Sequence, residues 1–203
     1  AWQALAHHDK VGGVAGHSVG ELAALAATGV ITDIEAMRLV GVRGRAMAEA
    51  AALEATGMSA VIGGDQDAVV ARLTELELTP ANYNGGGQLV AAGALDALAQ
   101  LSAEPVASTR VIPLQVAGAF HTRYMQPAVD ALRAEASTVA PSDPTLTLWT
   151  NRDGSTVTSG ASALDLLIGQ VANPVRWDLC MAAFADAGVT GIIELAPAGT
   201  LTG

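Results

Sequence analysis

The chain has 203 residues, of which 51% are hydrophobic and only 3% aromatic, so it is long enough for one well-buried core packed from small aliphatic side chains. Its net charge of −10 argues against a nucleic-acid partner, because no basic stripe is available to displace phosphate counterions. No apolar run reaches the ~20 residues of a membrane span, and the single cysteine, Cys180, fits a buried position in a reducing, cytoplasmic setting.

The first quarter of the sequence predicts a strand, a sharp turn and two helices. Residues 10–15 form a short apolar stretch that runs into Gly16-His17-Ser18-Val19-Gly20, and an Ala-rich segment follows. Thr32 with Glu35 three residues later is the pattern of a capping box, which predicts a helix over 33–51.

Residues 56–116 show a different alternation, in the order β-α-β-β-α-β, which is typical of a split-βαβ or ferredoxin-like unit. Both ends of such a unit meet, so we predict a subdomain inserted into a core made of 1–55 and 117–203, a core that looks truncated at both ends. The expected strands are 58–62, 78–83, 88–92 and 109–116, and the expected helices are 65–76 and 94–103.

After residue 116, helices alternate with buried strands. This alternation predicts an α/β fold with a mainly parallel sheet and helices on both faces. The expected helices are 125–139, 161–171 and 177–187, and the expected strands are 146–150 and 191–195.

Gly16-x-Ser18-x-Gly20 between a strand and a helix has the form of a nucleophile elbow. Flanking glycines let the chain turn sharply enough to present a serine hydroxyl above the sheet. The backbone amide of Val19 then lies where an oxyanion would develop, at the start of the following helix. In a glycine-rich chain a chance match is the alternative.

His121 is the candidate base for Ser18, because a neutral serine hydroxyl is a poor nucleophile without one. It follows an expected strand and precedes an expected helix, and such loops are where the sites of α/β sheets gather. The alternative is a structural loop histidine. We expect the His17 side chain to point away from the serine, into packing or a local hydrogen bond.

Arg43 stands on the apolar stripe of the helix predicted over 33–51. A buried guanidinium without an anionic partner costs several kcal/mol, so two interpretations remain open. Arg43 either makes a structural salt bridge or clamps the carboxylate of a ligand. Arg45, by contrast, falls on the solvated face.

Five motifs then occur in order. Together they resemble the bacterial malonyl-CoA:acyl-carrier-protein transacylases of fatty-acid synthesis, and the likeness extends over essentially the whole chain, to Glu194–Gly199. The motifs are Gly16–Glu21, Arg43–Met47, Asn82–Gln88, Ala119–Thr122 and Gln170–Trp177.

The resemblance implies an α/β-hydrolase-like core with a ferredoxin-like subdomain, and ping-pong chemistry. Ser18 would attack the malonyl thioester, coenzyme A would leave, and the phosphopantetheine thiol of acyl carrier protein would attack the acyl-serine. His121 would serve as base, then acid, then base again, steadied by a backbone carbonyl near Gln170. Arg43 corresponds to the family's carboxylate-binding arginine, and Phe120 to a residue type associated with malonyl over bulkier branched units.

The resemblance also sets the expected partners, which are malonyl-CoA and acyl carrier protein. We expect a monomer without a further cofactor or metal. One departure concerns the second oxyanion donor, which in the family is a Gln in a Gly-Gln-Gly stretch before the elbow. No such stretch precedes Ser18; if it is absent from the protein, we expect a poorly folded fragment slowed on the order of 100-fold or more.

Three alternative functions share parts of this pattern. An acyltransferase of a polyketide synthase has the same fold, although many carry Gln where this chain has Val19. A serine esterase or thioesterase has the elbow and histidine, and its third member would be one of Asp65, Asp67 and Asp96. A non-catalytic carrier-binding fragment would keep the fold alone.

Arg123, Arg152 and Arg176 follow motif positions near the expected carboxyl edge of the sheet. We expect some of them to meet the acidic carrier protein, because charge complementarity speeds encounter. Ordinary surface charge is the alternative for each of them.

Overall fold

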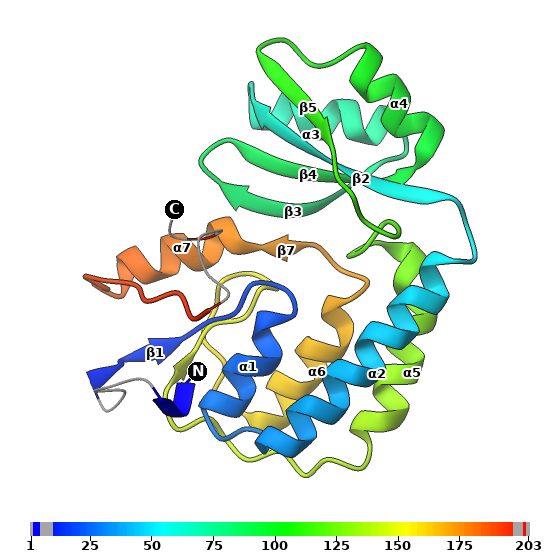
Figure 1. The fold of residues 1–203 in the computed structure, drawn as a ribbon. Coiled ribbons are helices and arrows are strands. Elements are labelled where there is room, and N and C mark those ends of the chain that lie inside the picture. The colour runs from blue at the N-terminus through cyan, green and yellow to red at the C-terminus, as the bar shows by residue number, and fades with distance from the viewer. Residues whose placement is uncertain (1, 5–9, 197–200, 202–203) are drawn as a thin grey trace.

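The structure is a computed structural model that describes residues 2–4, 10–196 and 201 (Figure 1). The expected end of the family likeness at Pro197–Gly199 lies outside the described residues. A short 3-10 helix, η1, covers Trp2–Ala4. None of the helices in the described ranges has both the length and the apolar character that crossing a bilayer requires.

Four helices pack together in one layer, drawn in the lower half of Figure 1. The largest core cluster lies among them, and its buried leucines include Leu39, Leu132 and Leu167. The four helices are α1 (Gly20–Ala27), α2 (Asp33–Ala51), α5 (Gln126–Ala136) and α6 (Gly160–Gln170). Apolar residues three and four apart along these helices produce the layer, since they place one stripe of each helix toward its neighbours.

The capping box predicted for α2 is confirmed. The Thr32 hydroxyl accepts a hydrogen bond from the Glu35 amide at 3.2 Å, and the Glu35 carboxylate accepts one from the Thr32 amide at 2.8 Å. These bonds satisfy two backbone donors that the first turn of a helix leaves unpaired.

The mainly parallel sheet that we expected of the core is found only in part among the described residues. Among the described residues, parallel pairing occurs between β1 (Gly13–Val14) and β6 (Thr147–Leu148), and between β3 (Thr79–Gly85) and β7 (Val175–Arg176). Residues 191–195 form no strand. Ile192 and Ile193 are 46% and 66% exposed, so the apolar run that predicted this strand is not buried against a sheet.

Residues 56–113 supply four strands of a five-stranded sheet with the order β5-β2-β4-β3-β7. The first four strands pair antiparallel throughout. They are β2 (Thr56–Gly63), β3 (Thr79–Gly85), β4 (Gln88–Ala94) and β5 (Thr109–Pro113), and the helices between them are α3 (Gln66–Glu75) and α4 (Leu95–Ala103).

The two sides of this sheet pack against different partners. Leu73 of α3 and Leu101 of α4 are fully buried against one side, with Val61 of β2. Met58 and Ala92 belong to a cluster on the other side, which also includes Ala119 and receives Phe120. The sheet therefore lies over the helical layer and encloses the segment that carries His121 (Figure 1).

The fifth strand ties the sheet to the rest of the chain. In β7 (Val175–Arg176), which leads into α7 (Trp177–Asp186), Val175 and Arg176 pair in parallel with Asn82 and Tyr83 of β3. The loop from α6 to α7 therefore lies beside both the sheet and the elbow at Ser18.

Candidate active site

The elbow at Ser18 is a strained turn between β1 and α1. Ser18 has a φ of 52°, in the left-handed region that side chains other than glycine rarely adopt. A Cβ added at Gly16 would lie 2.0 Å from the carbonyl carbon of Gly20 and 2.3 Å from the amide nitrogen of Glu21, so no larger residue fits. A Cβ added at Gly20, by contrast, would have no atom within 4 Å. The turn therefore depends on Gly16.

Asn151 fixes this turn from outside the motif. Its side-chain oxygen accepts a hydrogen bond from the Ser18 amide at 2.8 Å, and its side-chain nitrogen donates to the Gly16 carbonyl oxygen at 2.8 Å. Asn151 is completely buried. It satisfies the backbone carbonyl and amide that flank His17, immediately before the strained residue, because a buried amide and carbonyl need partners.

Ser18 and His121 lie within hydrogen-bond distance, with 2.7 Å between Ser18 Oγ and His121 Nε2. The other ring nitrogen of His121 lies 2.9 Å from the backbone oxygen of Gln170. Since a carbonyl oxygen only accepts, Nδ1 carries the hydrogen and Nε2 is free to take the serine proton. The neighbouring segment is held by His121 N donating to Val171 O at 3.0 Å. The expected base and its backbone support are therefore brought together.

The environment of His121 disfavours its charged form. Burial lowers its pKa to about 4, against the effect of the hydrogen bond to Gln170 O, and the positive charge of Arg43 lowers it further. The ring is consequently neutral near pH 7, the state in which Nε2 accepts a proton.

Arg43 is buried beside the serine. It is 7% exposed, and its Nη2 lies 3.1 Å from Ser18 Oγ and 3.4 Å from Gln170 Oε1. Its Nε is a buried nitrogen without a hydrogen-bond partner, and none of the ion pairs among the described residues includes Arg43. Burial lowers its pKa to about 10, partly offset by the charge of Glu21.

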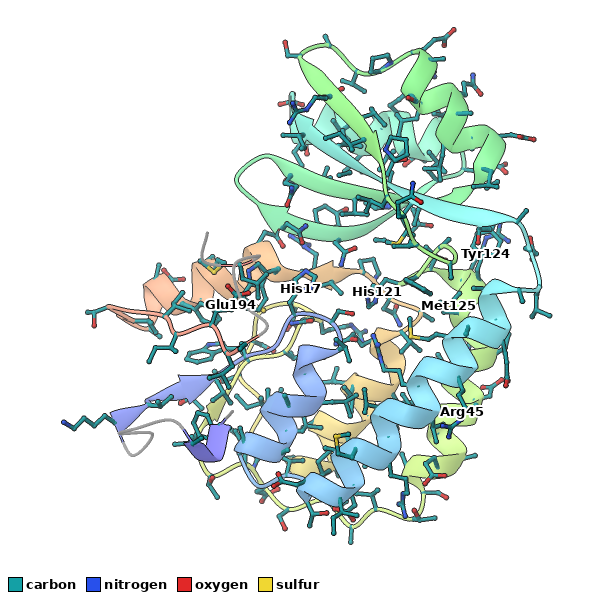
Figure 2. All side chains as sticks on the ribbon, viewed as in Figure 1. His17, Arg45, His121, Tyr124, Met125 and Glu194 are labelled. Atoms are coloured by element: carbon teal, nitrogen blue, oxygen red, sulfur yellow. The ribbon has the colours of Figure 1, made fainter. Side chains whose placement is uncertain are left out.

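These observations bear on the two interpretations of Arg43. The structural salt bridge does not form within the described part of the chain, and donors of the guanidinium remain available next to the nucleophile. Arg45, two residues on, is exposed and lies on the outer side of α2 (Figure 2), as expected.

Glu21 and Asn151 were missed by sequence reasoning. Glu21 is 4% exposed. Its carboxylate accepts a hydrogen bond from the backbone amide of Asn151 at 2.6 Å and another from Gln170 Nε2. Burial raises the pKa of Glu21 to about 7. Like Arg43, Glu21 is a charged residue on an apolar helical face, because the buried Ala24 and Leu25 follow it by three and four residues. This spacing is the signal that could have identified Glu21.

The Gln170 side chain takes part in the site as well as its backbone. Its Nε2 donates to the Ser18 carbonyl oxygen at 2.9 Å and to Glu21 Oε2, and its Oε1 accepts from Arg43. This one amide therefore contacts the nucleophile's backbone, the buried acid and the buried cation.

Val19 and Phe120 lie next to Ser18 and His121 in the chain, at the start of α1 and in the segment under the sheet. Val19 is the N-cap residue of α1 and is 47% exposed, so its backbone amide lies at the open, positive end of that helix. Phe120 is half-buried and packs against both the helical layer and the sheet.

His17 points away from the serine, as expected. Its Nε2 lies 3.0 Å from Asn84 Oδ1 in β3. Its ring packs edge-to-face with Trp177, with 5.7 Å between the two ring centroids. Burial lowers the pKa of His17. Figure 2 shows the His17 and His121 side chains between the sheet and the helical layer, and besides burial the charge of His17 contributes to lowering the pKa of His121.

The three aspartates of the esterase alternative do not support His121. The Asp65 carboxylate caps α3 by accepting from the Ala68 amide at 2.9 Å, and Asp67 and Asp96 are exposed on α3 and α4. The partner of the imidazole is a carbonyl instead.

Cys180 is a fully buried thiol. It donates to the Thr150 carbonyl oxygen at 3.3 Å, and burial raises its pKa to about 12. It is therefore a packing residue, as expected, and not a nucleophile.

The model of the acyl transferase domain family matches residues 2–203. The chain belongs to this family. The malonyl CoA-acyl carrier protein transacylase of Mycobacterium bovis is 53% identical over 190 residues, covering 94% of this chain and 63% of that protein. The protein of the same name from Salmonella typhimurium is 38% identical over 197 residues, with 94% and 63% covered.

Solved structures place the fold in the same group. The crystal structure of MCAT from Mycobacterium tuberculosis superimposes with a TM-score of 0.91 at 55% identity, over 93% of this chain and 63% of that chain. A type II PKS acyl-carrier protein in complex with its malonyl-transacylase gives a TM-score of 0.83 at 31% identity, over 88% and 60%. The chain spans a little under two thirds of the length of these relatives.

Proposed function

We propose that this acyl transferase domain transfers a malonyl group from malonyl-CoA to the phosphopantetheine thiol of acyl carrier protein, in fatty-acid biosynthesis. The observation that carries the proposal is a buried guanidinium, 3.1 Å from the hydroxyl of Ser18, that forms no ion pair with any acid in the described part of the chain. A malonyl thioester has a free carboxylate close to its reacting carbonyl, and a guanidinium binds a carboxylate through two parallel hydrogen bonds.

The first half-reaction uses the Ser18–His121 pair. Ser18 Oγ attacks the thioester carbonyl while its proton passes to His121 Nε2, and the Val19 amide stabilises the oxyanion. The intermediate collapses, the carbon–sulfur bond breaks, and the coenzyme A sulfur takes the proton from His121. Malonyl-Ser18 remains.

The second half-reaction runs the same steps with the carrier. The phosphopantetheine thiol gives its proton to His121 and attacks the acyl-serine carbonyl, and Ser18 regains that proton as it leaves. A neutral imidazole is needed at the start of both halves. A malonyl carboxylate at Arg43 would cancel part of the positive charge that, after burial, lowers the pKa of His121, so substrate binding favours proton transfer.

The domain organisation belongs to the same proposal. We assign residues 1–55 and 117–203 to an α/β-hydrolase-like core and 56–116 to an inserted ferredoxin-like subdomain. The antiparallel order β5-β2-β4-β3 supports this division, and the pairing of β7 with β3 joins the two parts. The enzyme would act as a cytoplasmic monomer that needs no cofactor or metal beyond its coenzyme A thioester substrate.

Acyl carrier protein is the proposed partner, and its acidic surface requires basic residues. Arg176 is already paired with Asp178 through bonds of 2.9 and 2.7 Å, so Arg123 and Arg152, both exposed, are the better candidates. Reversing either of these two to Glu should slow transfer to the carrier at low salt and leave acylation by malonyl-CoA unchanged. Unchanged transfer rates would remove both from the docking surface.

The proposed function is tested with the full-length protein, wild type and Arg43→Ala, on malonyl-CoA and acetyl-CoA. Loss of a charge-assisted pair worth ~3 kcal/mol lowers kcat/KM for malonyl-CoA about 100-fold, and acetyl-CoA, which has no carboxylate, is affected far less. Arg45→Ala, on the exposed face of the same helix, is the matched control and should behave as wild type. Equal losses on both substrates would contradict the carboxylate clamp.

A mass measurement on intact protein tests the covalent step separately. Incubation with malonyl-CoA should add one malonyl group to the wild type and none to Ser18→Ala. An unmodified wild type would favour the non-catalytic, carrier-binding alternative.

A further inference from the structure

Two opposite charges are buried close together in this site without forming an ion pair. Glu21 of α1 and Arg43 of α2 are 4% and 7% exposed, and each charge acts on the pKa of the other. A direct pair between them would be the simplest way to compensate both charges in a poorly solvated interior. None of the ion pairs among the described residues joins them.

The side-chain amide of Gln170 lies between these charges. Its Nε2 donates to Glu21 Oε2 and to the Ser18 carbonyl oxygen at 2.9 Å, while Oε1 accepts from Arg43 Nη2 at 3.4 Å. The orientation of the amide is set by its surroundings, because only the NH2 group can donate to a carboxylate and a carbonyl.

The amide satisfies the two charges unequally. The Glu21 carboxylate accepts short hydrogen bonds from the Gln170 NH2 group and from the backbone amide of Asn151, the latter at 2.6 Å. Arg43 donates only a long hydrogen bond to the Gln170 side chain, of 3.4 Å, and its Nε has no hydrogen-bond partner. The carboxylate is thus held away from the guanidinium, and the guanidinium keeps donors for something else.

We propose that Gln170 is a specificity-determining spacer, which stops Glu21 from pairing with Arg43 and so keeps Arg43 open to the carboxylate of the acyl substrate. The inference rests on the proposed function and adds to it the reason why the protein's own acid does not occupy the clamp. Gln170 has this role through its side chain, whereas its backbone carbonyl supports His121.

The spacer is tested with Gln170→Leu, which keeps most of the side-chain volume and the backbone carbonyl but removes the amide. Without its Nε2 donor, the Glu21 carboxylate turns to Arg43 and competes with the substrate. The ratio of kcat/KM for malonyl-CoA to that for acetyl-CoA should fall at least tenfold, mainly through KM for malonyl-CoA.

The double variant Gln170→Leu with Glu21→Gln separates competition from simple loss of a contact. Removing the carboxylate should restore the malonyl-to-acetyl ratio to within about threefold of wild type. A Gln170 that merely packs, or merely touches the substrate, gives no such rescue. Gln170→Met with the same partner change repeats the test if the leucine variant folds poorly, as judged by its thermal unfolding.

The outcomes distinguish this inference from the proposed function. A wild type that neither takes up malonyl on Ser18 nor prefers malonyl-CoA overturns both. A wild type that prefers malonyl-CoA, with a Gln170→Leu variant of unchanged preference or a double variant that is not rescued, overturns the spacer alone. A fall in the ratio that Glu21→Gln reverses supports it.

Discussion

Replacing Gly16 by alanine tests the geometry of the elbow most directly. The new Cβ would lie 2.0 Å from the carbonyl carbon of Gly20 and 2.1 Å from its oxygen, and these are backbone atoms that cannot rotate away. Gly20 begins α1, whose Leu22 and Leu25 are 3% and 2% exposed, so the helix cannot retreat without disturbing the core.

Relieving this clash has two measurable costs. Forcing extra volume into a packed interior destabilises a protein by ~1–3 kcal/mol, and a displacement of about 1 Å between Ser18 and His121 lowers the rate by about 100-fold. Gly16→Ala should therefore unfold at a lower urea concentration and show kcat/KM for malonyl transfer reduced by that factor.

Gly20→Ala is the matched control within the same motif. A Cβ there meets nothing within 4 Å, and alanine is favoured over glycine in a helix by up to ~1 kcal/mol. This variant should equal or exceed the wild type in stability and keep its activity. If both alanine variants behave alike, the close approach at Gly16 is not what determines the turn.

Three further changes probe the buried network. Burial raises the pKa of Glu21 from 4.5 to about 7, so between these pH values the native state keeps a proton that the unfolded state releases. The free energy of unfolding therefore falls as pH rises from 4.5 through 7, by on the order of 3 kcal/mol. Glu21→Gln should remove this contribution to the difference between the unfolding free energies measured in urea at pH 5 and pH 8, and an unaltered difference would refute it. Burial lowers the pKa of His121 to about 4, so its imidazole stays neutral, and able to accept a proton, down to that pH. We therefore expect kcat/KM to decline as pH falls through about 4. A decline near pH 6.5 would contradict the lowered pKa. Asn151→Ala leaves the Ser18 amide and the Gly16 carbonyl without partners and should cost ~2–5 kcal/mol in unfolding free energy, while a loss under 1 kcal/mol would show that water replaces the side chain.

Local patterns predicted most of the elements, and they predicted the three side chains, Ser18, His121 and Arg43, that the structure brings together. Ser18 was found because its motif is contiguous, and Arg43 because a charge on an apolar helical stripe is visible in one helix. His121 was found from its place after an expected strand. Each of these signals lies within a few residues of sequence, where spacing decides which side chains share a face.

The sheet was harder to predict because strand pairing is not local. An apolar run such as 191–195 fits a buried strand, yet it becomes one only where another strand presents free backbone groups. Conversely, the two residues of β7 pair with β3, which lies about ninety positions earlier in the chain. Periodicity alone does not choose between these outcomes.

The same limit applies to the polar network, and it explains why one residue nevertheless pointed to function. Asn151 bonds to Ser18 across 133 positions of sequence, and the Gln170 side chain bonds to the serine carbonyl across 152, so the spacing within a motif shows neither of these contacts. These contacts satisfy the buried polar groups around the elbow, as protein interiors require. The exception among the described side chains is Arg43 Nε. Folding leaves this buried donor unsatisfied, and Nη2 of the same guanidinium lies 3.1 Å from Ser18 Oγ. The proposed binding of a malonyl carboxylate would supply the missing partner, because that carboxylate lies one short acyl chain from the carbonyl that Ser18 attacks.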